Sequence, residues 1–548
     1  MNSHGFMDRI HSFLCKSALS IAFMITMFIT VIIILNSIAW YGSFNNADWM
    51  NSMNPVIIIA SIIIAIAIFG LIMTLHDDII RLKPMMTGIV CTAIIMLTGI
   101  AWTVFAAETE PEDSYELMEI AATIHEHGFL TADTPLYDDT LPDAYAYITH
   151  YPYQSGVLLY MMLMMMFTGA SMNMLVMRLI SAIIIIPISG ILIGMIAREI
   201  AVKTRHNGNS AFNMTMIMLT LYSPFAMSGY KIYGNILCLP FMFLGILMII
   251  KLTDENMNTH AFIRSAIILF ISAFGMLWFK TNMMITVIAM IIILILGLLK
   301  HRKRNLILMP IIIIAAILGS IIPVNIMQSF TDADLKNSRQ PAMSWIAMGT
   351  DYNPLTATPG FYQEDYLGGT WNDDWTPDKA SENARQLFNE HVNRLNENNW
   401  WIQMLARKTL YSWSEPSFAV FGRSLIQASG TRQDKVFTAF MNDNKTMFML
   451  YWDGLQMLVM VLVCIMLFQF IRMHECNEAI VLPAMILIGG FLFHYLWETQ
   501  PEYAYTYFLL MFPYSGILLS GIQLKKYELS YQSCERTPHF RAVMNQHA

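Results

Sequence analysis

At residues 108–115 the sequence reads ETEPEDSY, directly after an apolar segment, and at 150–156 it reads HYPYQSG, shortly before the next one. The loop that contains both, 105–173, holds eleven Asp or Glu residues, the last being Asp143, and no Lys or Arg. Because the rest of the chain is mostly apolar, this water-facing loop with charges of only one sign requires an explanation. Such a loop can hold a carboxylate at a membrane surface, as an enzyme would need if one substrate came from lipid and the other from water.

The composition is that of an integral membrane protein. Hydrophobic residues make up 56% of the chain, charged residues 13%, and the mean hydropathy is +0.50. Soluble domains carry about 25% charged residues. With a formal net charge of −7 and no basic domain, we expect the lipid bilayer as a partner and no nucleic acid.

Twelve apolar stretches are long enough to span a bilayer, and each predicts a helix because open sheet edges are excluded from lipid. They lie near residues 17–40, 55–75, 85–105, 174–197, 211–229, 235–251, 262–279, 282–299, 306–327, 448–471, 479–496 and 504–522. The expected fold class is an all-α polytopic membrane protein.

Basic residues predict the orientation of these spans, because cytoplasmic loops are enriched in Lys and Arg. One side of the bundle receives Arg9, Lys16, Arg81, Lys83, Arg198, Lys203, Arg205, Lys300, Arg302, Lys303, Arg304, Arg472, Lys525 and Lys526. We therefore expect a multi-pass plasma-membrane protein with both termini in the cytoplasm. The loop 105–173, the segment 328–447 and the loop around Glu498 then lie on the extracytoplasmic face.

This topology predicts five parts. A two-helix extension (1–84) precedes a transmembrane core (85–327) that carries the acidic loop, and a small extracytoplasmic domain follows (328–447). The last helices (448–524) lead to a cytoplasmic tail (525–548). Within the outer domain, apolar residues at helical spacing predict helix over 380–410.

The acidic loop itself predicts two helices on the outer surface. Residues 113–128 have an apolar face at helical spacing, and Gly128 suits the C-terminal stop. Asp113 can serve as the N-cap, which is one explanation for an acid at that position. Residues 156–168 form a second apolar stretch, too short to span, which predicts an interfacial helix.

Four short motifs give the chain a resemblance to the GT-C superfamily of polyprenol-phosphate-sugar glycosyltransferases. It is nearest to the branch of protein O-mannosyltransferases and aminoarabinose transferases. The motifs are the acidic stretch 110–114, HYPYQSG at 150–156, FKTN at 279–282, and HYLWETQPEY at 494–503. The chain departs from that pattern in its two extra N-terminal helices. It also departs at Glu502, where relatives often have Arg.

The resemblance implies a GT-C-type bundle of about twelve helices that moves a sugar from a polyprenyl-phosphate donor on the extracytoplasmic face. Direct displacement would invert the anomeric centre, with one carboxylate as general base. The acceptor would be a protein, a wall polymer or a glycolipid. The implied site residues are Asp113 or Glu112 as base, Lys280, His494 and Arg178 for the donor phosphate, and Tyr151, Tyr153, Gln154, Asn282, Glu498 and Tyr503 for the pocket.

Each of these residues also has a structural explanation. Lys280 can extend to the interface, His494 and Glu498 can satisfy each other, and interfacial tyrosines are common anchors. The tract 371–375, with Trp371, Asp373, Asp374 and Trp375, could stack a carbohydrate, although an ordinary turn is the simpler interpretation. Clustered acids could ligate a divalent cation such as Ca²⁺, Mg²⁺ or Mn²⁺, and this alternative stays open. We expect no cofactor or metal, because Asp138, Asp139 and Asp143 lack the spacing of a calcium loop.

Three other functions stay open. A transporter should carry charges along a path near mid-membrane, and most of these spans have none. An O-antigen-ligase-like or polymerase enzyme would rely on outer arginines, for which the late segment offers Arg385, Arg394, Arg407, Arg423 and Arg432. A non-catalytic scaffold would leave the acidic loop unexplained.

Overall fold

The computed structural model describes residues 3–35, 55–106, 112–137, 144–254, 257–355, 359–361, 375–421, 440, 443–473 and 477–522. Within these ranges the chain is helical and has no strand beyond one isolated bridge between Leu130 and Thr331. Among the described residues, ten helical segments are long and apolar enough to cross a membrane. They are α1 (Ser3–Leu35), α2 (Pro55–Thr74), α4 (Pro84–Ala106), α8 to α9 (Leu175–Lys203), α12 and α13 (Gly234–Leu252), α14 (Thr259–Phe279), η4 and α15 (Thr281–Leu299), α16 (Asn305–Met327), α22 (Lys445–Arg472) and α23 (Glu478–Leu496). The predicted all-α polytopic membrane class is confirmed.

Two of the twelve predicted spans are broken into shorter helices. The stretch 211–229 forms α10 (Gly208–Leu221), α11 (Ser223–Met227) and η3 (Ser228–Tyr230), and the stretch 504–522 forms α24 (Pro501–Leu509) and α25 (Phe512–Gly521). Pro224 and Pro513 lie in the first turns of α11 and α25. A proline has no backbone N–H and its ring clashes with the preceding turn, so each ends the helix before it. Composition predicted these two apolar stretches, but it did not predict that each is divided into shorter helices.

The helices α14 and α16 pack closely through small residues, as is common in membranes. A Cβ added at Gly319 of α16 would lie only 2.4 Å from the Phe274 carbonyl oxygen of α14. Ala315 and Ala316 are buried, whereas Ile317 is about half exposed. This contact fixes the ends of two helices that reach the site described below.

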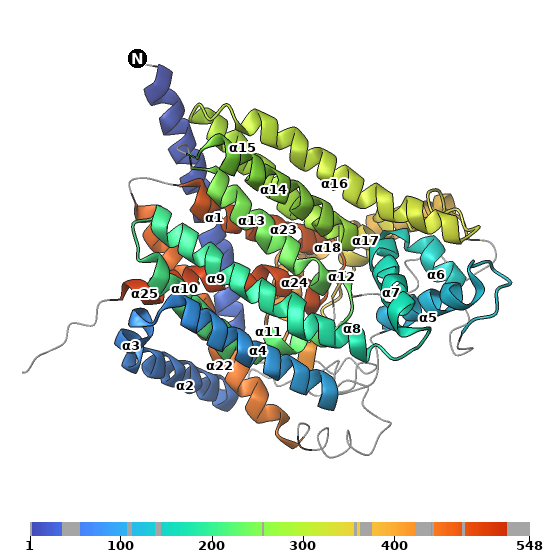
Figure 1. Cartoon of the computed structure of the whole chain (residues 1–548), viewed down its shortest axis with the longest axis horizontal. Coiled ribbons are helices and arrows are strands. Elements are labelled where there is room, and N and C mark those ends of the chain that lie inside the picture. Colours follow the sequence, from blue (N-terminus) through green and yellow to red (C-terminus); the bar gives the residue numbers. More distant parts are fainter. Residues whose placement is uncertain are drawn as a thin grey trace, which may run out of the picture.

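The acidic loop forms a compact group of helices at one end of the bundle (Figure 1). It comprises α5 (Glu112–His127), α6 (Ala144–His150), η1 (Pro152–Gln154) and α7 (Ser155–Thr168). Both predicted helices are present, and Gly128 and Gly169 end them with positive φ of 77° and 81°. Since α5 begins at Glu112, Asp113 lies inside its first turn rather than before it, where the N-cap prediction had placed it.

The outer segment packs directly on the acidic loop. Its described helices are α17 (Ala342–Gly349), α18 (Pro377–Asn398) and α19 (Trp401–Trp413), with Asn399 in the left-handed region between the last two. Trp345 and Ala384 are buried in the same apolar cluster as Leu117 and Ile120 of α5. The two regions therefore share one core.

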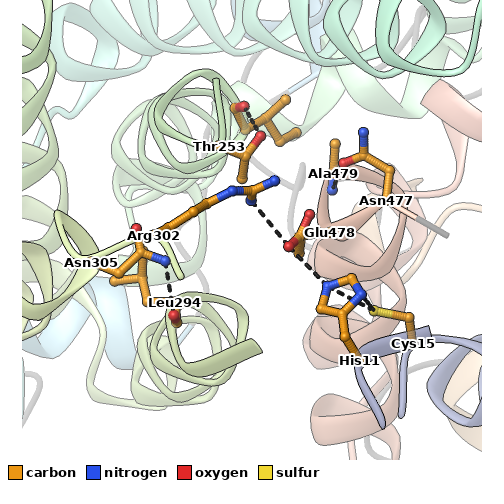
Figure 2. A network of polar contacts seen from close by, with 10 residues as sticks. His11, Cys15, Thr253, Leu294, Arg302, Asn305, Asn477, Glu478 and Ala479 are labelled. Carbon is orange, nitrogen blue, oxygen red and sulfur yellow. Dashed lines mark hydrogen bonds and ion pairs between the residues drawn. The ribbon is translucent and has the colours of Figure 1, made fainter. Parts of the chain in front are cut away.

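A buried polar network joins three distant parts of the chain at the other end of the bundle (Figure 2). Glu478, at the start of α23, accepts from His11 Nε2 of α1 at 2.9 Å and pairs with Arg302 Nη1 at 3.0 Å. Arg302 lies between α15 and α16. Glu478 and His11 are each 1% exposed, so this network holds α1 against the rest of the bundle.

Candidate functional site

A cavity of about 1030 Å³ lies where α16 ends and the outer segment begins. Its wall combines the end of α14, the last two turns of α16, the residues 335–345, the first turn of α18 and the loop after α23. Five residues predicted from sequence line it, from parts of the chain far apart: Tyr153, Lys280, Asn282, Glu498 and Tyr503. The structure thus brings three of the four motifs to one place.

Lys280 supplies the buried positive charge of this cavity. It is 8% exposed, and its ammonium lies 4.5 Å from the ring centroid of Tyr233 and 5.3 Å from that of Tyr503. Aromatic faces attract a cation within about 6 Å. Burial lowers the pKa of Lys280, and the carboxylates of Glu502 and Asp113 oppose that shift. Lys280 therefore faces the cavity instead of extending to the interface.

A second lysine, which the motifs had not pointed to, lies on the other flank of Tyr233. Lys231 is buried, its ammonium is 4.7 Å from the Tyr233 ring centroid, and it forms an ion pair with Glu502. The departure at Glu502 thus has a local explanation, since this acid neutralises Lys231. The two lysines differ, because the described residues give Lys280 ring contacts but no ion pair.

A tight backbone contact brings these groups together. A Cβ at Gly234 would lie 2.3 Å from the Phe279 carbonyl oxygen. Only glycine allows α12 to approach the end of α14 this closely, and the contact sets Tyr233 beside Lys280. Gln154 of η1 donates to the Tyr233 hydroxyl at 2.5 Å and fixes the same ring from the opposite side.

Asp113 does not line the cavity, but its charge acts on several groups that do. Its side chain is half-buried, and the neighbouring Ser114 is fully buried and donates to the Ile232 carbonyl at 3.0 Å. Burial raises the pKa of both Tyr233 and Tyr503, and the Asp113 carboxylate contributes to each shift. The first turn of α5 is therefore anchored beside the segment that carries Lys231 and Tyr233.

Glu498 is the buried acid of the cavity wall, which also includes the exposed Asp378. It is 5% exposed, and its two carboxyl oxygens accept from Gln500 Nε2 at 2.8 Å and from the Tyr503 hydroxyl at 3.1 Å. Burial raises its pKa to about 7, although both hydrogen bonds and Lys280 act in the other direction. This carboxyl group can change its charge near neutral pH.

The other predicted residues lie behind the wall or away from it. His494 stacks on Tyr503 at 5.3 Å, and its Nδ1 contacts the backbone oxygen of Glu498 at 3.4 Å, so it does not pair with that carboxylate. Tyr151 is buried against Tyr153 and Trp345. Arg178 is buried in α8 and is not among the cavity residues. His494, Tyr151 and Arg178 therefore stabilise the surrounding structure and do not line the cavity.

Several cavity residues were missed from sequence. Tyr233, Trp345, Lys336 and Arg339 line the wall, and the last two are exposed at its rim. Tyr233 could have been found through its neighbour Lys231. This lysine lies in a short loop on the expected outer face, where the positive-inside rule leaves few cations. The rim residues had no signal, because their segment has no pattern apart from mixed polarity.

The late outer arginines named from sequence, Arg385, Arg394 and Arg407, do not line the cavity, whereas Arg339 does. Arg394 pairs with Asp351 at 2.7 Å, and neither Arg385 nor Arg407 lines the cavity. Arg423, Arg432, Trp371, Asp373, Asp374, Asp138, Asp139 and Asp143 fall outside the described residues, as does the side chain of Glu112. Trp375 packs on His150, with ring centroids 3.9 Å apart.

No protein-family model matches the chain, and no curated protein matches its sequence. A crystal structure of ArnT from Cupriavidus metallidurans bound to undecaprenyl phosphate is similar with a TM-score of 0.34 and 11% identity, over 79% of this chain and 76% of that one. Agreement at this level transfers no residue role, so the site rests on its own geometry.

Proposed function

We propose that this protein is a membrane glycosyltransferase that moves a sugar from a polyprenyl-phosphate donor to an acceptor on the extracytoplasmic face. The observation that carries the proposal is the position of Lys280. A buried ammonium faces a cavity of about 1030 Å³ whose wall includes apolar turns of α14 and α16. A lipid phosphate needs both features, a cation for its headgroup and an apolar surface for its chain.

The charges around the cavity support Lys280 as the phosphate contact. Lys231 is already neutralised by Glu502, while Lys280 has only ring contacts among the described residues. A phosphate entering the cavity would gain a charge-assisted hydrogen bond from Lys280, and such bonds are about twice as strong as neutral ones. Tyr153 and Asn282 line the same wall and can contact the sugar.

In the proposed reaction, Asp113 acts as general base. It takes the proton of the acceptor hydroxyl as that oxygen attacks the anomeric carbon, and the phosphate leaves with the bonding electrons. The result is inversion in one displacement, and Lys280 balances the charge that develops on the departing phosphate. The Ser114 hydrogen bond to the Ile232 carbonyl anchors the first turn of α5 next to Tyr233, and the charge of Asp113 acts on Tyr233, Tyr503 and Lys280; both observations support a position near the reacting centre.

A transfer assay tests this proposal. Purified protein in lipid nanodiscs receives a labelled polyprenyl-phosphate monosaccharide together with peptide, wall-polymer or glycolipid acceptors. We expect transfer by the wild type and a loss of about 10²–10⁴-fold in Asp113→Asn, the usual contribution of a positioned base. Glu126→Gln, at the exposed end of the same helix, is the matched control and should retain activity. A folded Asp113→Asn variant with unchanged transfer would remove Asp113 from the mechanism.

A further inference from the structure

A buried lysine that no motif had indicated lies behind the cavity wall. Lys408, in α19, is 3% exposed. Its ammonium donates to three backbone carbonyls, those of Gly349 at 2.6 Å, Tyr495 at 2.8 Å and Trp497 at 2.8 Å. A lysine ammonium has three donors, so this geometry uses all of them.

These carbonyls belong to two helix ends. Gly349 is the last residue of α17, Tyr495 lies in the last turn of α23, and Trp497 follows that helix directly. The carbonyls at a helix C-terminus lack partners within the helix and carry its negative partial charge. One cation therefore satisfies and joins two C-termini that would otherwise expose unpaired carbonyls in a buried place.

The same helix ends also meet through a contact that only glycine allows. A Cβ at Gly349 would lie 2.3 Å from the Leu496 oxygen and 2.5 Å from the Trp497 carbonyl carbon. The Thr499 N–H donates to the Gly360 oxygen at 2.8 Å, and Gly360 itself lies beside the Lys408 ammonium. Trp497 and Thr499 are thus both held by these contacts, and Glu498 lies between them in the chain.

We propose that Lys408 is a positioning residue that holds the segment 496–499 so that Glu498 presents its carboxyl group to a hydroxyl of the transferred sugar. The inference rests on the proposed function for the identity of the substrate, but the holding contact itself does not depend on it. Burying an ammonium is costly, and burial lowers the pKa of Lys408 well below its usual value. An apolar side chain would fill the same space without this cost, but it could not join three carbonyls.

The first test measures the segment and requires no activity. Hydrogen exchange of the amides in 497–500 is compared in the wild type, Lys408→Met and Lys408→Gln. We expect faster exchange in Lys408→Met, with partial protection in Lys408→Gln because an amide keeps two donors. Lys251→Met is the matched control, since Lys251 pairs with Glu199 at 3.9 Å at the distant end of α13. Unchanged exchange in Lys408→Met would overturn the positioning role.

The second test asks whether Lys408 acts through Glu498. A misplacement of about 1 Å can cost roughly 10²-fold in rate, so Lys408→Met should lower kcat/KM by about that factor. If Lys408 acts only by placing Glu498, adding Lys408→Met to Glu498→Gln should cause no further loss. Additive losses in the double variant would mean a general structural role and would overturn the proposal.

A second variant covers the case in which Lys408→Met does not fold. Gly349→Ala places a methyl group against the Leu496 and Trp497 carbonyls of the same segment and should raise exchange at 497–500 as well. The two proposals fail in different ways. A wild type without transfer from any polyprenyl-phosphate donor contradicts the proposed function, whereas the exchange data still decide whether Lys408 holds the segment.

Discussion

At one end of the bundle, His11 and Arg302 converge on Glu478, and the three side chains form a closed network between separate helices (Figure 2). At the other end, Lys280 faces a cavity between two tyrosine rings. The ends are separated by the length of α16, about 34 Å for its 23 residues. The first arrangement satisfies its charges internally and suits a structural role. The second leaves a cation to be neutralised by a ligand.

The largest effect on stability should follow from breaking the network of His11, Arg302 and Glu478. Glu478→Gln removes the carboxylate that Arg302 and His11 share in a mostly buried site, and breaking a buried pair costs about 3–5 kcal/mol in the free energy of unfolding. Denaturant titration in mixed micelles measures this loss, with the exposed Glu390→Gln as control. Transfer per folded molecule should not change. A variant as stable as the wild type would show that the network is not a structural clamp.

At the cavity end, stability should depend on pH through Glu498. Its pKa is raised from 4.5 to about 7, so the folded protein holds this proton more tightly than the unfolded chain does. The resulting stabilisation is complete below about pH 4.5 and is lost as the pH rises through 7, which amounts to about 3 kcal/mol. The unfolding free energy of the wild type and Glu498→Gln, measured from pH 4.5 to 8, tests this. Parallel curves would contradict the raised pKa.

A smaller effect is expected from the paired lysine. Lys231→Met removes the cation that pairs with Glu502, so the negative charge of Glu502 acts more strongly on Lys280, and we expect the Kd for polyprenyl phosphate to rise about tenfold. Adding Glu502→Gln removes the competing charge and should restore the affinity. Scintillation proximity binding measures both variants. If the double variant binds as weakly as Lys231→Met, Lys231 contacts the ligand itself.

Most of the architecture could be predicted from sequence because lipid imposes strong rules. Spanning length and apolar composition gave ten helices directly, and periodicity gave α5 and α7. The breaks at Pro224 and Pro513 were missed because composition alone does not say whether a proline kinks a helix or ends it. The shared core of α5 and α17 was missed because it depends on contacts between distant segments.

The candidate site likewise contains residues that could be predicted from the sequence and residues that could not. Lys280 and Glu498 were predicted because each lies in a short motif that resembles the GT-C superfamily. The sequence could not show that Lys231 and Glu502 pair, since 271 positions separate them. Lys408 could not be predicted for a related reason. Its partners are backbone carbonyls, which every residue has, so the side-chain sequence does not indicate them.

The difference between the two ends can be measured most directly by ligand binding. The Kd of long-chain polyprenyl phosphate is determined for the wild type, Lys280→Met and Arg302→Met in nanodiscs. We predict that Lys280→Met weakens binding by at least about tenfold, the loss of one charge-assisted hydrogen bond. Arg302→Met should bind like the wild type. Unchanged binding in Lys280→Met, or an equal loss in both variants, would contradict the assignment of the cavity as the donor phosphate site.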